Sequence, residues 1–372
     1  MAFCLFRYFP FGGLQRDFKH IAEACQERGH VISVYTSAWE GDMPSDFRVL
    51  LVPVRGITNH QRSWNFSKDV NKILAKQPND LVVGFNKMYG LDVYYAADPC
   101  YRAKVMEEKG SLYRFGPRYQ TYFALEKAVF EASSKTQVLL ISEKERYHYV
   151  TYYGTSVERL HSLPPGIARD RVVSGDIDTI RKVVRNSQGV TNDELLLLMV
   201  GSSFKTKGLD RALRALAALP EYLRKKTRLF VIGEGKPGPF EKLAKRLKVR
   251  GQLNFLGGRN DVPQFMVSAD LLLHPAYSEN TGTVLLEAMA AGLPVLATDV
   301  CGYAPHISAA EAGLLISSPY QQQSFDNLLQ EMLLSTRREI WKRNGIEYVK
   351  KNDFFNMPEK AAALIESIAI NR

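Results

Sequence analysis

Apolar positions along this chain follow two periods. Short apolar runs of strand length recur, and between them apolar residues are spaced as on one face of a helix. Residues 14–28 are such a helical segment, with apolar residues at 14, 18, 21, 22 and 25. The predicted strands are residues 1–6, 31–36, 49–54, 81–85 and 137–141, then 195–200, 229–232, 253–256, 270–274 and 295–298. This alternation predicts an α/β fold with parallel sheets covered on both faces.

A stiff connector interrupts the alternation at residues 163–167, which contain two prolines and a glycine. We therefore predict two Rossmann-like, doubly wound domains at residues 1–166 and 167–352. Such domains bind ligands where the carboxyl ends of their strands meet. Residues 353–372 form a terminal segment with a helix from Pro358. In the first domain, Ser142 and Glu145 predict a capping box at the start of a helix.

The segment Tyr277–Gly292 contains two glutamates separated by seven residues. Glu279 is predicted in a loop after a strand, and Glu287 about a turn into the following helix. The residues between them, Asn280, Thr281, Gly282 and Thr283, form the turn and the helix start. A helix N-terminus suits a phosphate, and carboxylates accept hydrogen bonds strongly from sugar hydroxyls. The alternative is a helix-capping Glu287 beside a solvated Glu279.

Four other stretches are candidate phosphate or nucleotide contacts. Gly12 and Gly13 lie between the first strand and helix, where a ligand could approach the backbone, or they form a plain tight turn. Asp17 lies one turn further, either facing the ligand or interacting with the helix dipole. Residues 201–208 contain Lys205 and Lys207, which could neutralise a diphosphate or be solvated loop lysines.

Two loops of the second domain complete the nucleotide candidates. Gly233 opens a glycine-rich loop that matches the dinucleotide-binding pattern in letters, but it follows an internal strand and contains prolines. It is predicted to lie near a nucleotide, and not to form an NAD site. Arg259 could stack on a base or pair with a phosphate, although its loop could equally be an Asn-Asp cap.

Charge and composition bear on partners more than on fold. The 372-residue chain has 45% hydrophobic residues, four scattered cysteines and a net charge of +10, which favours an acidic partner. Residues 101–130 contain seven aromatic and six basic residues, which suits an anionic membrane surface or single-stranded nucleic acid. A buried aromatic face with basic residues along its edge is the alternative.

Acidic residues outside the glutamate pair offer few further sites. Asp98 ends an apolar stretch of the first domain and could orient an acceptor hydroxyl, or it could form an Asp-Pro turn. Asp176 and Asp178 have the spacing of a metal motif but are predicted to cap a helix. No metal site and no transmembrane helix are expected.

Several strings together resemble a known family. They are FRYFPFGGLQRD, VVGFNKM, GLDVYYAAD, LLLHPAYSENTGTVLLEA and AGLPVLATDVCGYA. They resemble the lipopolysaccharide core glucosyltransferase I family, retaining enzymes with the GT-B fold, over essentially the whole chain. Two positions depart from the wider GT-B group: Ser203 stands where an Arg is usual, and His306 where a Glu is common.

The resemblance implies a metal-independent transfer of glucose from UDP-glucose to an inner-core heptose on a lipid, across a cleft between the domains. It implies that Glu287 binds the ribose, Lys207 and the Gly282 helix end the diphosphate, and Glu279 the glucose, with Gly13 against the phosphates. It also implies a terminal helix that returns to the first domain. The site would be the cytoplasmic face of the bacterial inner membrane, with no nucleic-acid partner. Another donor or acceptor, a nucleic-acid-binding protein and an NAD enzyme remain the alternatives.

Overall fold

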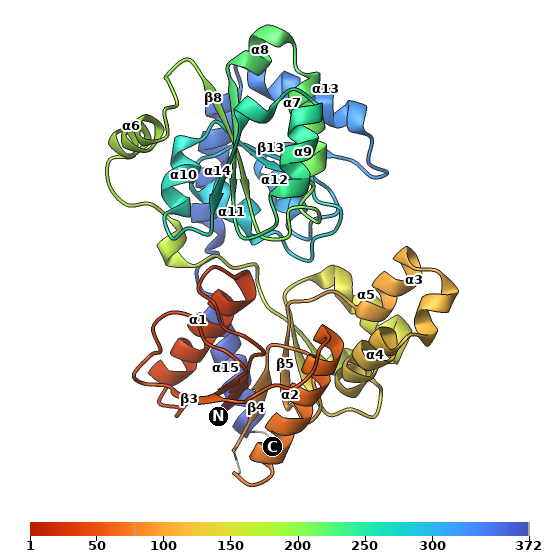
Figure 1. The fold of residues 1–372 in the computed structure, drawn as a ribbon. Coiled ribbons are helices and arrows are strands. Elements are labelled where there is room, and N and C mark those ends of the chain that lie inside the picture. The colour runs from red at the N-terminus through yellow and green to blue at the C-terminus, as the bar shows by residue number, and fades with distance from the viewer. Residues whose placement is uncertain (78, 371–372) are drawn as a thin grey trace. The chain divides into compact units, whose positions relative to one another are not determined.

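The computed structural model describes residues 1–77 and 79–370, and the chain divides into two compact units (Figure 1). Unit 1 comprises Met1–Pro164 together with the segment from Asn356 on, and unit 2 comprises Pro165–Phe355. The chain passes between the units at Pro164 and Pro165, within the stretch predicted as the connector.

Unit 1 contains a seven-stranded parallel sheet with the order β3-β2-β1-β4-β5-β6-β7. Its strands are β1 (Ala2–Cys4), β2 (Ser33–Thr36), β3 (Arg48–Leu51), β4 (Val82–Gly84), β5 (Val93–Ala96), β6 (Gln137–Leu140) and β7 (Leu160–Ser162). The chain fills one side of β1 first and then the other, so the order reverses between β1 and β4. That reversal is the position at which open parallel sheets bind ligands.

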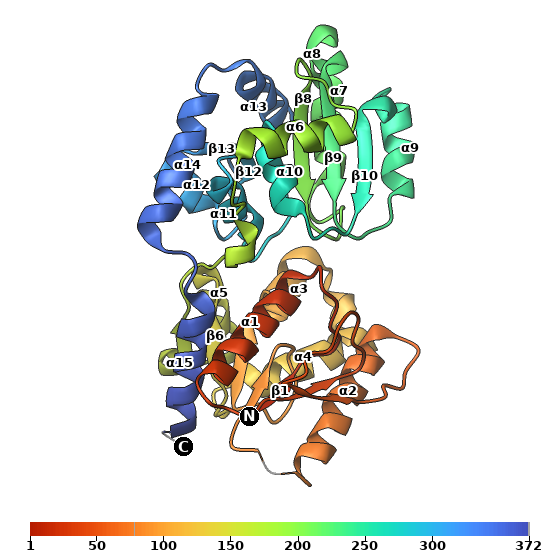
Figure 2. The ribbon, with the colours of Figure 1, turned by 90° about the vertical axis from the view of Figure 1, so that its left-hand side faces the viewer.

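Helices cover both faces of this sheet. They are α1 (Gly13–Glu27), α2 (Asn59–Leu74), α3 (Tyr101–Glu108), α4 (Pro117–Phe130), α5 (Glu143–Tyr153) and α15 (Met357–Ile370). Figure 2 shows α1 and α15 side by side, and their apolar residues share one core cluster. The terminal helix expected to return to the first domain therefore packs on unit 1. Residues from α2, α3, α4 and α5 form the cluster on the other face.

Unit 2 repeats the arrangement with a six-stranded parallel sheet of order β10-β9-β8-β11-β12-β13. Its strands are β8 (Leu195–Val200), β9 (Thr227–Ile232), β10 (Leu253–Gly257), β11 (Leu271–His274), β12 (Val295–Thr298) and β13 (Gly313–Ile316). Leucine-rich strands such as β8 and β11 are buried on both faces, which is why they lack the alternation of a half-exposed strand.

The helices of unit 2 form two layers. One core cluster contains residues of α10 (Val262–Ser268), α11 (Thr283–Ala290) and α12 (Ala304–Ala310). The other contains residues of α7 (Leu209–Ala218), α9 (Gly238–Arg246) and α13 (Gln322–Leu334). The remaining helices are α6 (Ile177–Ser187), α8 (Glu221–Lys225) and α14 (Arg338–Asn352).

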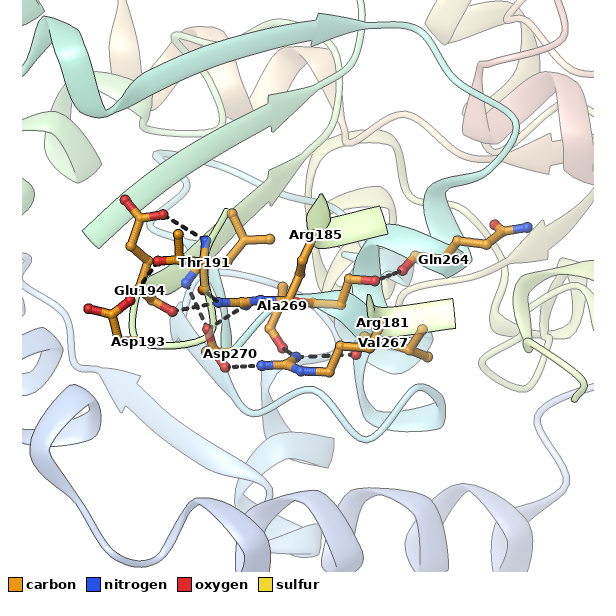
Figure 3. Close-up of polar contacts among 11 residues, drawn as sticks. Arg181, Arg185, Thr191, Asp193, Glu194, Gln264, Val267, Ala269 and Asp270 are labelled. Atoms are coloured by element: carbon orange, nitrogen blue, oxygen red, sulfur yellow. Dashed lines mark hydrogen bonds and ion pairs between the residues drawn. The ribbon is translucent and has the colours of Figure 1, made fainter. Parts of the chain in front are cut away.

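A partly buried ion network links α6 to the amino-terminal ends of β8 and β11 (Figure 3). Asp270 accepts hydrogen bonds from Arg181 at 2.6 Å and Arg185 at 3.2 Å, and from the backbone N–H of Leu196 at 2.7 Å. Arg185 also donates to carbonyls of the 191–194 turn. These contacts lie at the edge of the sheet opposite the carboxyl ends of the strands, so they hold the fold together away from the predicted site.

Two local predictions can be compared with the helix starts. Asp176 caps α6 as predicted, accepting from the backbone N–H groups of Asp178 and Thr179. The capping box at Ser142 was wrong, because the Ser142 side chain forms no cap bond. The Glu145 carboxylate instead accepts a hydrogen bond from the backbone N–H of Cys100 at 2.7 Å. Glu145 therefore bonds to a residue distant in the sequence and not to the start of its own helix.

Candidate functional site

In unit 2 the strand order reverses between β8 and β11, and the loops after these two strands carry most of the predicted site. Lys207 lies in the loop after β8, and Glu279 lies in the loop after β11. The two side chains form an ion pair. The topological switch point of unit 2 is therefore bridged by the lysine and the first glutamate of the predicted site.

Glycine makes this approach possible. Gly208 has φ +79°, and a Cβ there would lie 1.9 Å from the carbonyl oxygen of Pro275. Any side chain at this position would push the end of the β8 loop away from the β11 loop. The same loop contains Ser203 at φ 60°, which is unusual for a residue other than glycine and gives the loop its sharp bend. The bend and the close contact place Lys207 beside Glu279.

His274 is the third member of this cluster. It is the last residue of β11, it is 1% exposed, and its Nε2 lies 3.3 Å from Oε2 of Glu279. Burial lowers the pKa of His274, because it disfavours the imidazolium, although the neighbouring carboxylate acts in the opposite direction. The imidazole is therefore neutral near pH 7.

Glu279 is ionised although it is nearly buried. Burial alone would raise its pKa, but the hydrogen bond from His274 and the charge of Lys207 outweigh burial and lower the pKa to about 2. An ionised carboxylate can only accept hydrogen bonds. The proton of neutral His274 therefore lies on Nε2, which donates a hydrogen bond to Glu279. The arrangement is a fixed, charged acceptor held by one neutral and one cationic donor.

The N-terminus of α11 lies three residues beyond Glu279. Its N-cap residue Gly282 has φ +86°, makes no side-chain cap bond, and is followed by a first turn without acidic residues. Thr281 and Thr283 flank this glycine, and Asn280 is 9% exposed. An uncapped helix start carries partial positive charge and free N–H groups, which suit an anion such as a diphosphate.

Glu287 lies one turn further along α11 and is 3% exposed. Oε1 of Glu287 lies 3.3 Å from Nε of Arg171, which is itself 9% exposed. Arg171 comes from the short 3₁₀ helix Arg169–Arg171 at the start of unit 2. Thus the second glutamate forms an ion pair with an arginine that is distant in the sequence.

Two other predicted nucleotide contacts, Lys205 and Arg259, lie in loops of unit 2 and are already paired within the protein. Lys205 donates to Asp210 at 2.8 Å and to the Tyr277 hydroxyl at 3.1 Å, so it does not join Lys207. Arg259 is held by Asp261 through two hydrogen bonds of 2.6 Å. This pairing differs from the proposed Asn-Asp cap, because Asp261 forms no side-chain cap bond with α10.

Gly233 serves a backbone contact. It has φ +141°, and a Cβ there would lie 2.4 Å from the carbonyl oxygen of Gly201. The loops that follow β8 and β9 therefore touch through glycine backbones. This contact places the β9 loop beside the loop that carries Lys207.

The candidates of unit 1 lie at the carboxyl ends of its own strands. Gly13 begins α1, and a Cβ there would meet no atom within 4 Å. The Asp17 carboxylate accepts a hydrogen bond of 2.8 Å from the Tyr95 hydroxyl, which ties α1 to β5. Asp98 follows β5 and lines a cavity of about 350 Å³. Lys87, one of two lysines that line this cavity, forms a buried ion pair with Glu126.

The segment 101–130 forms α3, a 3₁₀ helix at Ser111–Phe115, and α4. Some of its aromatic residues are buried, Tyr119 and Phe130 among them. The aromatic Phe115 is 80% exposed, and the aliphatic Leu112 is 84% exposed. The segment therefore contributes both to the core of unit 1 and to an exposed apolar surface with basic neighbours.

Sequence reasoning placed Lys207 in the site and considered His274 site-lining or structural, but it paired neither His274 with Glu279 nor Arg171 with Glu287. His274 was visible as the polar last residue of an apolar strand directly before the glutamate loop, and that position was the available signal. Arg171 carried no such signal. Among the residues that the structure describes, no three His, Cys, Asp or Glu side chains are arranged to hold a metal ion. In the same part of the chain no helix is long and apolar enough to cross a membrane.

Comparisons with known proteins agree with this geometry. The family model described as "Glycosyl transferases group 1" matches residues 180–348, and the "Glycosyltransferase Family 4" model matches residues 11–171. Lipopolysaccharide glucosyltransferase WaaG of Escherichia coli K12 is 49% identical over 366 residues, 98% of each chain. A D-inositol 3-phosphate glycosyltransferase of Catenulispora acidiphila is 31% identical over 188 residues, covering 47% of this chain and 43% of its own.

Solved structures give the same assignment of fold. A crystal structure of WaaG, a glycosyltransferase involved in lipopolysaccharide biosynthesis, superposes with a TM-score of 0.96 at 49% identity, covering 98% of this chain and 99% of the other. Anabaena HepE in complex with UDP-glucose superposes with a TM-score of 0.76 at 17% identity, covering 98% and 99%. At that identity the second match shows the fold alone.

Proposed function

The chain belongs to the family of the lipopolysaccharide glucosyltransferase WaaG, is a glycosyltransferase with the GT-B fold, and on that premise we propose its reaction. It transfers glucose from UDP-glucose to an inner-core heptose of lipopolysaccharide, with retention of the α configuration. The observation that carries the proposal is the cluster at the switch point of unit 2. There a fixed carboxylate is paired with a lysine from another loop and lies three residues before an uncapped helix start.

The donor binds to unit 2 with each group of the cluster in a separate role. Lys207 and the N–H groups at Gly282 neutralise the diphosphate. Glu279, ionised and held by His274, accepts hydrogen bonds from glucose hydroxyls. Glu287, oriented by Arg171, accepts hydrogen bonds from the ribose hydroxyls. Lys207 exchanges its contact with Glu279 for the diphosphate when the donor enters.

The chemical step needs no protein nucleophile. The bond between C1 of glucose and the β-phosphate oxygen breaks, and the acceptor hydroxyl oxygen bonds to C1 from the same face. The acceptor proton passes to the leaving phosphate, so the products are UDP and the glucosylated acceptor. Catalysis comes from stabilising the charge that develops on the leaving UDP, which Lys207 and the helix N-terminus supply, and from alignment of the reactants. We propose that this step requires no metal ion.

The acceptor binds to unit 1, with Asp98 accepting a hydrogen bond from an acceptor hydroxyl. Because the acceptor is attached to a lipid, the enzyme works at an anionic membrane surface, on the cytoplasmic face of the bacterial inner membrane. The exposed Leu112 and Phe115, with Lys109 and Arg114 nearby in the chain, support this contact, since apolar and basic side chains together bind such surfaces.

The test is donor turnover with UDP-glucose, UDP-galactose and UDP-N-acetylglucosamine on heptose-ended core acceptors, with and without a chelator. Transfer is expected from UDP-glucose and is expected to be unaffected by the chelator. Glu279→Ala should lower kcat about 100-fold, as when a preorganised group is removed, while the Kd for UDP does not rise. Glu347→Ala, which removes an exposed acid on α14, is the matched control. Full activity of Glu279→Ala, or transfer from another donor only, would contradict the proposal.

A further inference from the structure

Unit 1 contains a pocket at its own topological switch point. The strand order of this sheet reverses between β1 and β4. The pocket of about 350 Å³ is lined by residues that follow β1, β4 and β5, namely Phe6, Asn86, Lys87, Met88, Asp98 and Pro99, together with side chains of α2, α3 and α4. Open parallel sheets bind ligands at this position. The location alone therefore indicates a ligand, and the lining indicates its chemistry.

The first cation of the lining is already neutralised. Lys87 is 12% exposed in its side chain and pairs with Glu126, which is fully buried. Lys87 also donates to the carbonyl oxygen of Pro99 at 2.9 Å. Burial would raise the pKa of Glu126, but Lys87 and the surrounding donors outweigh it and lower the pKa, so both partners are charged. The pair serves as the floor of the pocket and is not available to a ligand anion.

Two other cations line the same pocket without such a partner. Lys104 of α3 and Arg118 of α4 form no ion pair within the described part of the chain. Arg118 is an exposed residue, and its guanidinium lies 5.7 Å from the ring centroid of Tyr122, which also lines the pocket. Asp98 is the carboxylate that remains in the lining once the Lys87–Glu126 pair is set aside. The ionised groups open to a ligand therefore carry two positive charges and one negative charge.

The apolar part of the lining suits a sugar ring. Tyr101, Tyr122, Phe6 and Phe66 present aromatic rings, on which the C–H faces of a saccharide pack. Asp98 can accept hydrogen bonds from hydroxyl groups, and a planar guanidinium matches the oxygens of a phosphate or a carboxylate. Aromatic walls, one hydroxyl acceptor and two unpaired cations together select a saccharide that carries negative charge.

We propose that this pocket binds an anionic sugar of the acceptor, with Lys104 and Arg118 contacting its phosphate or carboxylate group. The proposal rests on the proposed function for the identity of the acceptor. It also divides the segment 101–130 between two tasks. Lys104 and Arg118 face the saccharide pocket, whereas the exposed Leu112 and Phe115 mark a different surface of the same segment.

The experiment measures binding without turnover. The probe is the core oligosaccharide released by complete deacylation of heptose-ended lipopolysaccharide, titrated by calorimetry into the full-length protein in the absence of donor. Three forms are used: the intact oligosaccharide, the same material after removal of phosphate with hydrofluoric acid, and the same material after reduction of its carboxylates. Lys104→Gln and Arg118→Gln are compared with Lys68→Gln, an exposed lysine of α2 that does not line the pocket.

Each pocket variant is expected to raise the Kd for the intact oligosaccharide about tenfold, the loss of one charge-assisted hydrogen bond, and Lys68→Gln to leave it within about twofold. The chemically treated form that lacks the recognised anion should bind all four proteins with nearly equal Kd, and this form identifies the anion as phosphate or carboxylate. A Kd unchanged in both pocket variants overturns the proposal. Equal losses for all three forms also overturn it, because then the side chains do not act through the anion. If the oligosaccharide binds as expected but no glucose is transferred from UDP-glucose, the proposed function fails and the pocket stands.

Discussion

Replacing His274 tests whether the orientation of Glu279 limits the reaction. In the structure Glu279 accepts hydrogen bonds from two side chains, Lys207 and His274. Once Lys207 turns to the diphosphate of a bound donor, His274 is the remaining side-chain donor to this carboxylate among the described residues. His274→Gln places an amide nitrogen close to the position of Nε2 and keeps a donor. His274→Asn is too short to reach Glu279 and removes it.

The expected loss of rate follows from the strength of the hydrogen bond between His274 and Glu279. A hydrogen bond to a charged group contributes about 1.5–3 kcal/mol, which corresponds to about 10- to 150-fold in rate if it acts in the transition state. His274→Asn should therefore lower kcat about 10- to 100-fold, and His274→Gln should remain within about fivefold of the wild type. The Kd for UDP should stay within about twofold in both, because UDP lacks the sugar that Glu279 is proposed to contact.

The pH profile separates orientation from simple packing. In the wild type the pKa of Glu279 is about 2, so its ionisation is complete throughout the usual assay range. Burial raises the pKa of Glu279, and the hydrogen bond from His274 lowers it. Loss of that hydrogen bond should therefore raise the pKa of Glu279. The acid limb of kcat should therefore move to higher pH in His274→Asn and not in His274→Gln. The assay is UDP release from pH 5 to pH 9. Equal losses in the two variants with no movement of the acid limb would refute the reasoning.

Two further predictions concern the fold and the phosphate site. Asp270→Ala should destabilise unit 2 by about 3 kcal/mol, since it leaves the buried Arg185 and the partly exposed Arg181 without their carboxylate. The measurement is urea unfolding followed by the fluorescence of Trp341, in a variant whose two unit 1 tryptophans are replaced by phenylalanine. Asp193→Ala, which removes a largely exposed acid, is the control and should leave the unfolding midpoint unchanged. Lys207→Ala should weaken UDP binding about tenfold or more, whereas Lys205→Ala should change it less than about twofold, as measured by calorimetry.

The layered fold could be predicted because its determinants are local. Buried parallel strands are continuous apolar runs, and helices between them show their own period, so the predicted strands lie within a few residues of the observed ones. The strands that escaped prediction are β5, β7 and β13. Two of them, β7 and β13, lie at sheet edges, where burial is less complete and the apolar run is weaker. Residues 93–96 were noticed only as an apolar stretch before Asp98.

The candidate site could be predicted only as far as its loops. Sequence position places Lys207 and Glu279 after strands β8 and β11, and parallel topology then places both at one sheet edge. Which side chains meet depends on backbone bends that carry little sequence signal. Lys205 and Lys207 are two positions apart, yet one pairs with Asp210 and the other with Glu279. The bend at Ser203 lies in the same loop, and a serine in the sequence does not predict a left-handed backbone conformation.

The ion pair between Lys207 and Glu279 links donor binding to release. Both side chains are mostly buried, and removing one partner of such a pair leaves the other with an uncompensated charge, at a cost of several kcal/mol. In the proposed mechanism UDP-glucose replaces both partners at once, because the diphosphate binds Lys207 and the glucose hydroxyls bind Glu279. UDP replaces the partner of Lys207 alone and leaves Glu279 with His274. After transfer, Glu279 and the diphosphate of UDP therefore compete for Lys207. Under this proposal the residues that bind UDP-glucose also favour the release of UDP.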